Sequence, residues 1–575
     1  MTRDTWPGVP VAAGVQPSYG ALDRAAAMID LEPETSATDA PRLGSPSTTA
    51  RRPRRSDRRR ADRRRTLGAV ASVGLLVPIC LVYLWFPQDS DGVLFELGAR
   101  RLAAGAVFYR DLWDIKQPGI YWFYQAGLAL GVGVVGPRLL EIAGALVGAL
   151  AVRRLTARWD LHPGVEFLAP VLVVGTYLLL THRGGVLVVE GLTVPLLVVV
   201  LAAAWPALPA GGDPRGPAGW AVAGLAAGCV GVLKLIYLPL PATLLLGALI
   251  ASRTSAGGRA GRLLAAAAGA AVPLLATVAY FAAHGVLGLA WTTTFRIPLE
   301  SVSSSDRETA YGNWVEMGVE LSTLLVPLTL VALATARRRR TLVRELTVLL
   351  VVLEIVVLAF QQYATPYRFL VVVAPMGVLA VVGADVVWRR LTAPGSRAGV
   401  RVVALLAAAV LALPLARGPQ RLLFAAKDVP AWGLGRAQRD ARDIVLTSAH
   451  TADDVEPVRG LVRPGEAIYV FGQPQLYTEL GTYEALEITG WAATLMPERV
   501  WRERDRELVR SRPRLVFVDA SIADAVRDHS PGFTAMLAAS YRRVGSTPGG
   551  TWYRTDRPGV PAGVPGDNRL TTTAP

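Results

Sequence analysis

Long apolar runs alternate with short polar segments along most of the chain. Runs close to 20 residues have the length that an α-helix needs to cross a bilayer core of roughly 30 Å. The pattern predicts eleven membrane spans. They cover residues 67–86, 138–155, 164–181, 186–205, 218–233, 235–251, 262–283, 317–336, 342–360, 369–388 and 400–416.

Arginine in the connecting segments indicates the orientation of the spans. Residues 51–65 hold ten arginines directly before the first span. Basic residues favour the cytoplasmic side, where they also bind anionic lipid headgroups. If 51–65 is cytoplasmic and 119–134 is not counted as a span, every dense basic cluster falls on that side. We therefore expect an orientation signal here and no nucleic-acid partner.

Residues 87–137, the first loop, then lie outside the cell and begin with several carboxylates. Residues 93–104 have an amphipathic spacing of apolar and charged side chains. Residues 119–130 are rich in the aromatic types that prefer the headgroup level. Both segments are predicted to be helices that lie along the outer membrane surface.

An odd number of spans leaves the C-terminal part outside as well. Residues 420–575 are more polar and alternate strand-like with helix-like segments. The predicted strands are 467–472 and 514–520, with late strands in SYRRVGST and TWYRTD, and the predicted helices are 498–511 and 521–540. This order predicts a small extracytoplasmic α/β domain without a glycine-rich phosphate loop.

Composition supports a polytopic α-helical membrane protein of the cell membrane. The chain is 52% hydrophobic and carries a net charge of +15, with a mean hydropathy of +0.36. Its two cysteines, Cys80 and Cys229, lie in apolar runs and predict no disulfide framework or metal cluster. The predicted parts are a disordered basic cytoplasmic tail (1–66), a transmembrane domain that includes the first loop (67–418), the extracytoplasmic domain (419–557) and a disordered tail (558–575).

Acidic residues at a membrane edge suit two functions. They can bind a cation or proton for transport, or one of them can act as a base toward a lipid-borne substrate. A leaving phosphate would need cations nearby. Candidates on the same face are Lys116, Arg183, Lys234, Arg296 and Arg368. Lys234 is an isolated lysine between two apolar runs. A charge at such a position costs free energy, which favours a functional lysine over one whose ammonium only extends to the membrane interface.

Several motifs resemble the GT-C superfamily of membrane glycosyltransferases, in particular the branch of protein O-mannosyltransferases and lipid A aminoarabinose transferases. Asp89-x-Asp91 follows the first span. The segment LAAGAVFYRDLWDIKQPGIYW resembles the family's "G-x-x-Y-x-D" and "Lys-Pro-Pro-x-x-Tyr" segments. Further likenesses are the span that ends at Lys234 and the turn QQYATPYRF. The sequence departs from the family in having Asp-Gly where Asp-Glu is common, and Lys-Gln-Pro in place of Lys-Pro-Pro.

The resemblance implies an inverting glycosyltransferase that uses a polyprenyl-phosphate sugar. Asp91 would be the base, with Asp89 as the alternative. The implied lipid-phosphate and donor site comprises Lys116, Lys234, Arg183, Arg296, Arg368, Tyr109, Tyr121 and Tyr367. Asp111 and Asp114 would hold the loop together through backbone groups. The resemblance implies no metal and no cofactor, since the lipid-linked sugar is a substrate.

The sequence is also compatible with functions other than glycosyl transfer. A transporter or lipid-handling protein would more often show repeated halves with broken spans, and no internal repeat is visible. Glu190 is a notable acid within a predicted span. A scaffold without activity is a further alternative. The sugar and the acceptor (protein, cell-envelope glycan or glycolipid) are not specified, and Trp491, Trp501 and Trp552 are more typical of a core than of a sugar platform.

Overall fold

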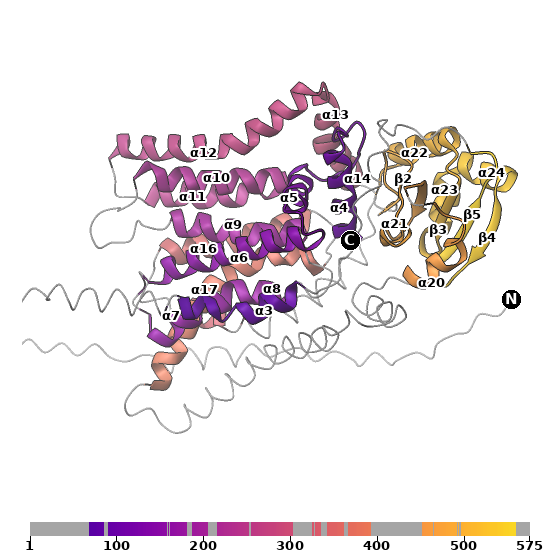
Figure 1. Ribbon diagram of the computed structural model, residues 1–575. Coiled ribbons are helices and arrows are strands. Elements are labelled where there is room, and N and C mark those ends of the chain that lie inside the picture. Colours follow the sequence, from indigo (N-terminus) through magenta and orange to yellow (C-terminus); the bar gives the residue numbers. More distant parts are fainter. Residues whose placement is uncertain are drawn as a thin grey trace, which may run out of the picture. The chain divides into compact units, whose positions relative to one another are not determined.

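A computed structural model describes most of residues 68–84, 90–180, 187–204, 216–251, 255–302, 325–334, 342–360, 366–392, 451–493 and 496–558. The predicted tails and the predicted span 400–416 lie outside the described residues. Figure 1 shows two kinds of structure in the described part: a stack of helices that ends at α17, and a later α/β domain.

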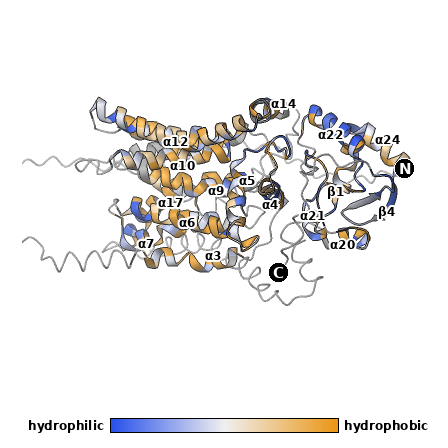
Figure 2. Cartoon of the chain, turned by 45° about the horizontal axis from the view of Figure 1, so that its top comes forward, coloured by the Kyte–Doolittle hydropathy of each residue, from blue (hydrophilic) through white to orange (hydrophobic). Residues whose placement is uncertain are grey.

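The helices of the first kind follow the predicted spans closely. They are α3 (Val77–Tyr83), α6 (Val135–Thr156), α7 (Pro163–Pro170), α8 (Thr176–Leu180), α9 (Val189–Ala204), α10 (Pro217–Leu233), α11 (Pro239–Ala251), α12 (Ala256–Ala283), α16 (Leu342–Phe360) and α17 (Leu370–Thr392). Among the described residues, α6, α12 and α17 are long and apolar enough to cross a membrane, and the others are shorter apolar helices. Their colouring in Figure 2 is mostly hydrophobic. These helices make the chain a membrane protein.

The predicted span 164–181 is not a continuous α-helix. Residues 164–181 form α7 and α8 with a π-helical turn, η2 (Val171–Gly175), between them. Pro170 directly precedes this turn and cannot donate a backbone hydrogen bond. The sequence pattern showed the apolar run but not the altered winding.

Small residues allow α10 and α12 to approach closely. A side chain at Gly224 or Gly228 would run into the backbone of Ala266 or Ala270, and one at Gly269 would meet Ala221. Close backbone contact of this kind is the usual way in which helices associate in lipid, where burial of apolar surface supplies little driving force. The close contact with α12 therefore helps to position α10, at whose C-terminal end Lys234 lies.

The two helices predicted in the first loop are present. They are α4 (Ser90–Ala103) and α5 (Gly119–Leu128). A side chain at Gly98 of α4 would overlap the ring of Tyr121 on α5, so the two helices touch directly. Phe95 packs edge-on against both Tyr121 and Tyr124, with ring centroids 5.4 and 5.7 Å away.

After α12, the chain continues through α13 (Leu287–Trp291), the π-turn η4 (Thr292–Arg296) and α14 (Ile297–Val302). Short 3-10 helices precede α11 and α17, namely η3 (Leu235–Tyr237) and η6 (Pro366–Phe369).

The C-terminal domain, residues 451–558 of the described chain, contains a five-stranded sheet in the order β2-β1-β3-β5-β4. The strands are β1 (Ala467–Phe471), β2 (Tyr483–Glu484), β3 (Leu515–Asp519), β4 (Arg542–Ser546) and β5 (Gly550–Arg554). β1 pairs in parallel with β2 and β3, whereas β5 pairs antiparallel with β3 and β4. The predicted α/β class of this domain is confirmed.

Alternating side chains of β1 divide the core of this domain in two. Tyr469 and Phe471 pack with α22 (Glu498–Ser511) and α24 (Pro531–Ser540). Ile468 and Val470 face the opposite cluster. That cluster includes residues of η8 (Glu456–Val458), which follows α20 (Thr451–Val455), and of α21 (Gln475–Leu480). Helices thus cover both faces of the sheet.

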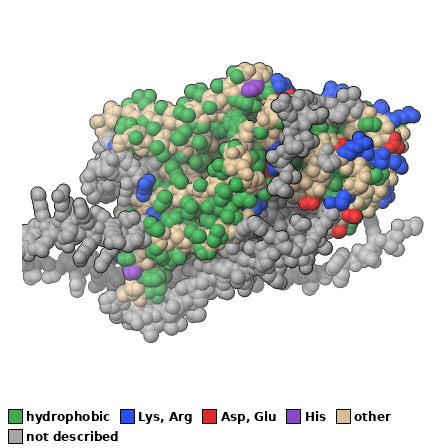
Figure 3. Space-filling view, viewed as in Figure 1, with side chains coloured by type: hydrophobic (Ala, Val, Ile, Leu, Met, Phe, Trp, Pro, Cys, Tyr) green, Lys and Arg blue, Asp and Glu red, His purple; other side chains and the backbone are tan. Residues whose placement is uncertain are grey.

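The predicted helix 521–540 is in fact interrupted. The structure has η10 (Ala520–Ile522), α23 (Ala523–His529) and α24, and Pro531 stands at the first position of α24. Proline fits this position because the first turn of a helix has no intrahelical partner for its N–H. Side chains of Lys and Arg are conspicuous over this domain in Figure 3, whereas hydrophobic side chains dominate the helical part.

Candidate functional site

Asp91 lies in the first turn of α4, where a carboxylate is favoured by the unpaired N–H groups of the helix start. Its side chain is almost buried, with 11% exposed. Its neighbours Gly92, Val93, Leu94 and Phe95 are buried too, which anchors this turn. The helix thereby fixes the direction of the carboxylate.

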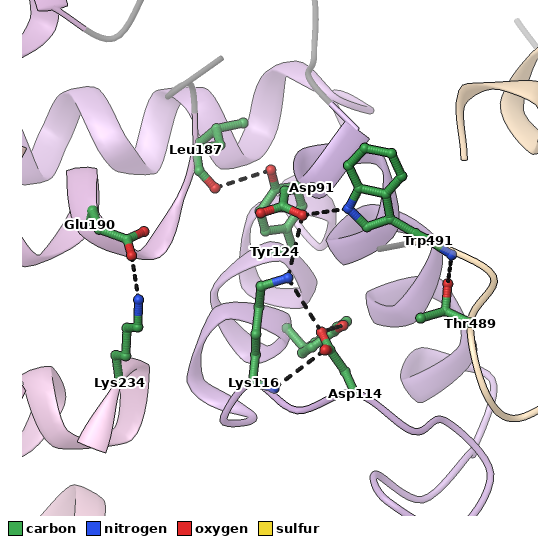
Figure 4. A network of polar contacts seen from close by, with 10 residues as sticks. Asp91, Asp114, Lys116, Tyr124, Leu187, Glu190, Lys234, Thr489 and Trp491 are labelled. Carbon is green, nitrogen blue, oxygen red and sulfur yellow. Dashed lines mark hydrogen bonds and ion pairs between the residues drawn. The ribbon is translucent and has the colours of Figure 1, made fainter. Parts of the chain in front are cut away.

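Lys116 contacts this carboxylate from the segment between the two helices of the first loop. Its Nζ lies 3.4 Å from Asp91 Oδ1 and 3.8 Å from Asp114 Oδ2. The same ammonium stands 4.9 Å above the centre of the Phe95 ring. Figure 4 shows Asp91, Lys116 and Asp114 converging on one place. Two carboxylates and a ring thus surround a single cation.

The acids of the first loop bind its backbone. Asp111 Oδ2 accepts from the Val107 N–H at 2.7 Å, and Asp114 Oδ1 accepts from the Lys116 N–H at 3.3 Å. Burial acts to raise the pKa of Asp111, but hydrogen bonds from Arg110 and from the Val107 N–H outweigh it and leave the pKa lowered. The carboxylate of Asp111 is therefore ionised and ties the turn together.

Two predicted tyrosines support this loop from inside. Tyr121 donates to Asp114 Oδ2 at 2.6 Å. Burial, together with the neighbouring charge of Asp114, raises its pKa, so the hydroxyl keeps its proton. Tyr109 donates to the Lys116 carbonyl at 3.0 Å and adopts a φ of 71°, a conformation that is costly for a residue with a side chain. Both tyrosines set the position of Lys116.

Lys234 forms a second ion pair. It terminates α10, and its Nζ lies 2.5 Å from Glu190 Oε1 at the start of α9. Tyr237 donates to the same oxygen at 3.2 Å, and its ring lies 4.8 Å from the ammonium. Only 3% of the Glu190 side chain is exposed. A buried carboxylate is thus matched by a cation and a hydroxyl.

The two ion pairs are neighbours in space. Gln117, next to Lys116, accepts from the Leu235 N–H at 3.4 Å, next to Lys234. A side chain at Gly119 would collide with the Val232 backbone, so α5 begins directly against the end of α10. Lys116 and Arg368 both lie within electrostatic range of the Lys234 ammonium. Lys116 therefore contacts Asp91 and is also a neighbour of the Lys234–Glu190 pair.

The other predicted site residues are placed differently. Arg296 pairs with Glu300 one turn later at 2.9 Å and is 68% exposed. Among its contacts in the described part of the chain, none reaches Asp91, Lys116 or Lys234. Tyr367 belongs to the short helix η6. Asp89 and Arg183 lie outside the described residues.

Some residues at the site were not predicted from the sequence. The Trp491 indole N–H donates to Asp91 Oδ1 at 2.7 Å, from a residue 400 positions later in the chain. Ser90, next to Asp91, bonds Gln473 and Gln475, and the Gln475 amide donates to its hydroxyl at 3.0 Å. These partners come from the C-terminal domain. Trp491 was expected to belong to a core, whereas it is half-buried and bonds Asp91, and no pattern in the sequence marks the two glutamines. Glu190 was noted as an acid in a span, but its pairing with Lys234 was not predicted.

The described residues contain no group of three or more His, Cys, Asp or Glu side chains that could hold a metal ion. Whether the chain needs a metal stays an expectation from the resemblance. The described side chains place the Asp91 carboxylate against one cation, Lys116, with the Lys234–Glu190 pair as a neighbour.

Comparisons with known proteins bear on the fold. No protein-family model and no curated protein matches the sequence. The crystal structure of ArnT from Cupriavidus metallidurans in the apo state matches 84% of this chain and 97% of its own, with a TM-score of 0.53 and 15% identity. The structure of ArnT from the same organism bound to undecaprenyl phosphate matches 85% and 97%, with a TM-score of 0.52 and 15% identity. The arrangement of helices and C-terminal domain described above is therefore similar to the fold of ArnT.

Proposed function

We propose that this protein is an inverting glycosyltransferase that moves a sugar from a polyprenyl-phosphate donor to a hydroxyl on the extracytoplasmic side of the cell membrane. The observation that carries the proposal is the buried Asp91 carboxylate paired with Lys116, together with Lys234, which lies within electrostatic range of Lys116 and Arg368. A base and a cluster of cations are what such a transfer requires. The ArnT fold, with one of its structures bound to undecaprenyl phosphate, adds support for a lipid-phosphate ligand.

In the proposed reaction, Asp91 accepts the proton of the acceptor hydroxyl. The hydroxyl oxygen bonds to the anomeric carbon as the bond from that carbon to the phosphate oxygen breaks, which inverts the configuration. The polyprenyl phosphate leaves with the bonding electrons, already charged, so no second strong acid is needed. Lys116, Lys234 and Arg368 stabilise the growing negative charge on the phosphate.

Partial burial of the two lysines serves this step, since 26% of the Lys116 side chain and 23% of the Lys234 side chain are exposed. In a site with little water, an ammonium stabilises an anion more strongly than in bulk solvent. Each lysine has a carboxylate partner, Asp91 or Glu190, that compensates its charge. We propose that the incoming phosphate draws Lys116 away from Asp91 and so leaves the carboxylate available as a base.

A donor panel tests the function. Membranes that contain the protein are incubated with radiolabelled polyprenyl-phosphate sugars and, separately, with nucleotide sugars. We expect transfer from one lipid-linked donor with release of polyprenyl phosphate, and no transfer from nucleotide sugars. Transfer from nucleotide sugars alone, or movement of a lipid or solute without any transfer, would replace the proposal by a different enzyme or by the transporter alternative.

A further inference from the structure

One segment of the C-terminal domain, residues 484–491, reaches the first loop. The Glu487 carbonyl accepts from the Trp113 N–H at 3.0 Å, and the Leu486 carbonyl accepts from Arg101 Nη1 at 3.3 Å. Trp113 and Ile115 of the loop also pack against the apolar core of the domain. The contact between the two parts is therefore built from backbone bonds and apolar packing together.

The end of this segment is fixed by the domain itself. The Gly490 N–H donates to the buried Glu484 carboxyl at 3.2 Å, and the Trp491 N–H donates to Thr489 Oγ1 at 3.1 Å. A side chain at Gly490 would overlap the Val470 carbonyl, so the turn lies flat on β1. The direction in which Trp491 leaves the turn is thus determined by residues of the C-terminal domain.

Trp491 delivers its indole N–H to the same Asp91 oxygen that Lys116 contacts. The Nε1–Oδ1 distance is 2.7 Å and the Nζ–Oδ1 distance is 3.4 Å. A second contact between the same parts, from Gln475 to Ser90, adjoins it. The indole is the nearer of these two donors to Asp91 Oδ1, and it belongs to a different domain.

We propose that Trp491 is a positioning residue for the Asp91 base, so that the catalytic site of this enzyme is completed by its C-terminal domain. The inference rests on the proposed function. An indole N–H is a neutral donor that keeps its proton, so it orients the carboxylate without exchanging protons with it. It also favours the ionised form of Asp91 and keeps the base deprotonated at lower pH. When the phosphate of the donor engages Lys116, the indole still donates to Asp91 and helps to keep it in place.

The test compares Trp491→Phe with Trp291→Phe, a matched control at a tryptophan that is 66% exposed. Trp491→Phe keeps an aromatic ring but removes the N–H. We expect kcat to fall about 10-fold to 100-fold, as for loss of a hydrogen bond to a charged group, while KM for the lipid donor changes less than about twofold. The acidic limb of the pH profile of kcat/KM should move to higher pH, because Asp91 loses a donor to its charged form.

A second variant distinguishes positioning from packing. Trp491→His restores an N–H donor on a smaller ring, and at pH 8, where its imidazole is neutral, it should recover part of kcat. It also carries the comparison if Trp491→Phe does not fold. If the wild type is active and Asp91→Asn is inactive, but Trp491→Phe keeps the wild-type kcat and pH profile, this inference fails while the proposed function stands. If the wild type transfers no sugar from any lipid donor, both fail.

Discussion

The Lys116 ammonium lies 3.4 Å from the Asp91 carboxylate, although the two residues sit on opposite arms of a loop and 25 positions apart. The tyrosines beneath the loop and the backbone bonds of Asp114 hold the lysine there. The proposed base and a proposed phosphate-binding cation are thus an ion pair in this structure.

Replacing Lys116 should impair the chemical step. We expect Lys116→Ala to lower kcat/KM by about 100-fold or more, because the leaving phosphate loses a cation in a site with little water. Lys116→Arg keeps the charge and should retain a substantial part of the activity. The comparison is made by steady-state transfer kinetics. An equal loss in the two variants would contradict a role based on charge.

Separating Lys234 from Glu190 should destabilise the protein. Lys234→Met leaves a buried carboxylate without its cation, and Glu190→Gln leaves the cation without its carboxylate; each should cost about 3 kcal/mol or more. The double variant should cost clearly less than the two single changes together. Unfolding in detergent provides the measurement. Additive losses would show that the two side chains do not depend on each other.

The contact between α4 and α5 leaves no room at Gly98. Gly98→Ala would push a methyl group into the Tyr121 ring, which holds Asp114 and through it Lys116. We expect a loss of about 1–3 kcal/mol in stability and a drop in activity. The control is Gly257→Ala in α12, where a methyl group meets nothing within 4 Å and should be neutral or stabilising. Similar behaviour of the two variants would contradict the tight contact.

Glu507 in the C-terminal domain should make stability depend on pH. Burial raises the pKa of its carboxyl from 4.5 to about 7. The folded domain therefore holds this proton more tightly than the unfolded chain does. The resulting stability is present at pH 4.5 and is lost as the pH rises to 7.

Glu507→Gln cannot ionise, and its amide oxygen can still accept from the Glu487 N–H, which lies 3.1 Å from the native carboxylate. The variant should be more stable than the wild type at pH 8, by on the order of 2 kcal/mol, and about equal at pH 4.5. Thermal unfolding at both pH values gives the comparison. If the wild type were more stable than Glu507→Gln at pH 8, its surroundings would stabilise the ionised Glu507 carboxylate, which would contradict this prediction.

Much of the fold could be predicted from local patterns. The helix predicted at 498–511 matches α22 at both ends, because its apolar residues repeat with helical spacing between Pro497 and an αL residue, Arg512. β2 was not predicted, because a strand of two residues is too short to show an alternation of apolar and polar side chains. The break between α23 and α24 was also missed, although Pro531 marked it.

The site was predictable only in part. Motif resemblance pointed to Asp91, Lys116 and Lys234, and the structure brings these residues together. The contributions of Trp491 and of Glu190 depend on how segments distant in the sequence pack together. The partner of a single tryptophan, or of a single acid in a span, cannot be predicted from local sequence. Arg296 stays a prediction as a donor-site cation; in the structure it pairs with Glu300 on the next turn.

The most direct test of the central claim is sugar transfer by purified protein in liposomes, with the donor identified in the panel, for wild type, Asp91→Asn and Asp89→Asn. The account predicts that Asp91→Asn still binds the donor but releases no polyprenyl phosphate, while the wild type releases one for each sugar transferred. Loss of transfer in Asp89→Asn alone, or full transfer by Asp91→Asn, would contradict the assignment of Asp91 as the base.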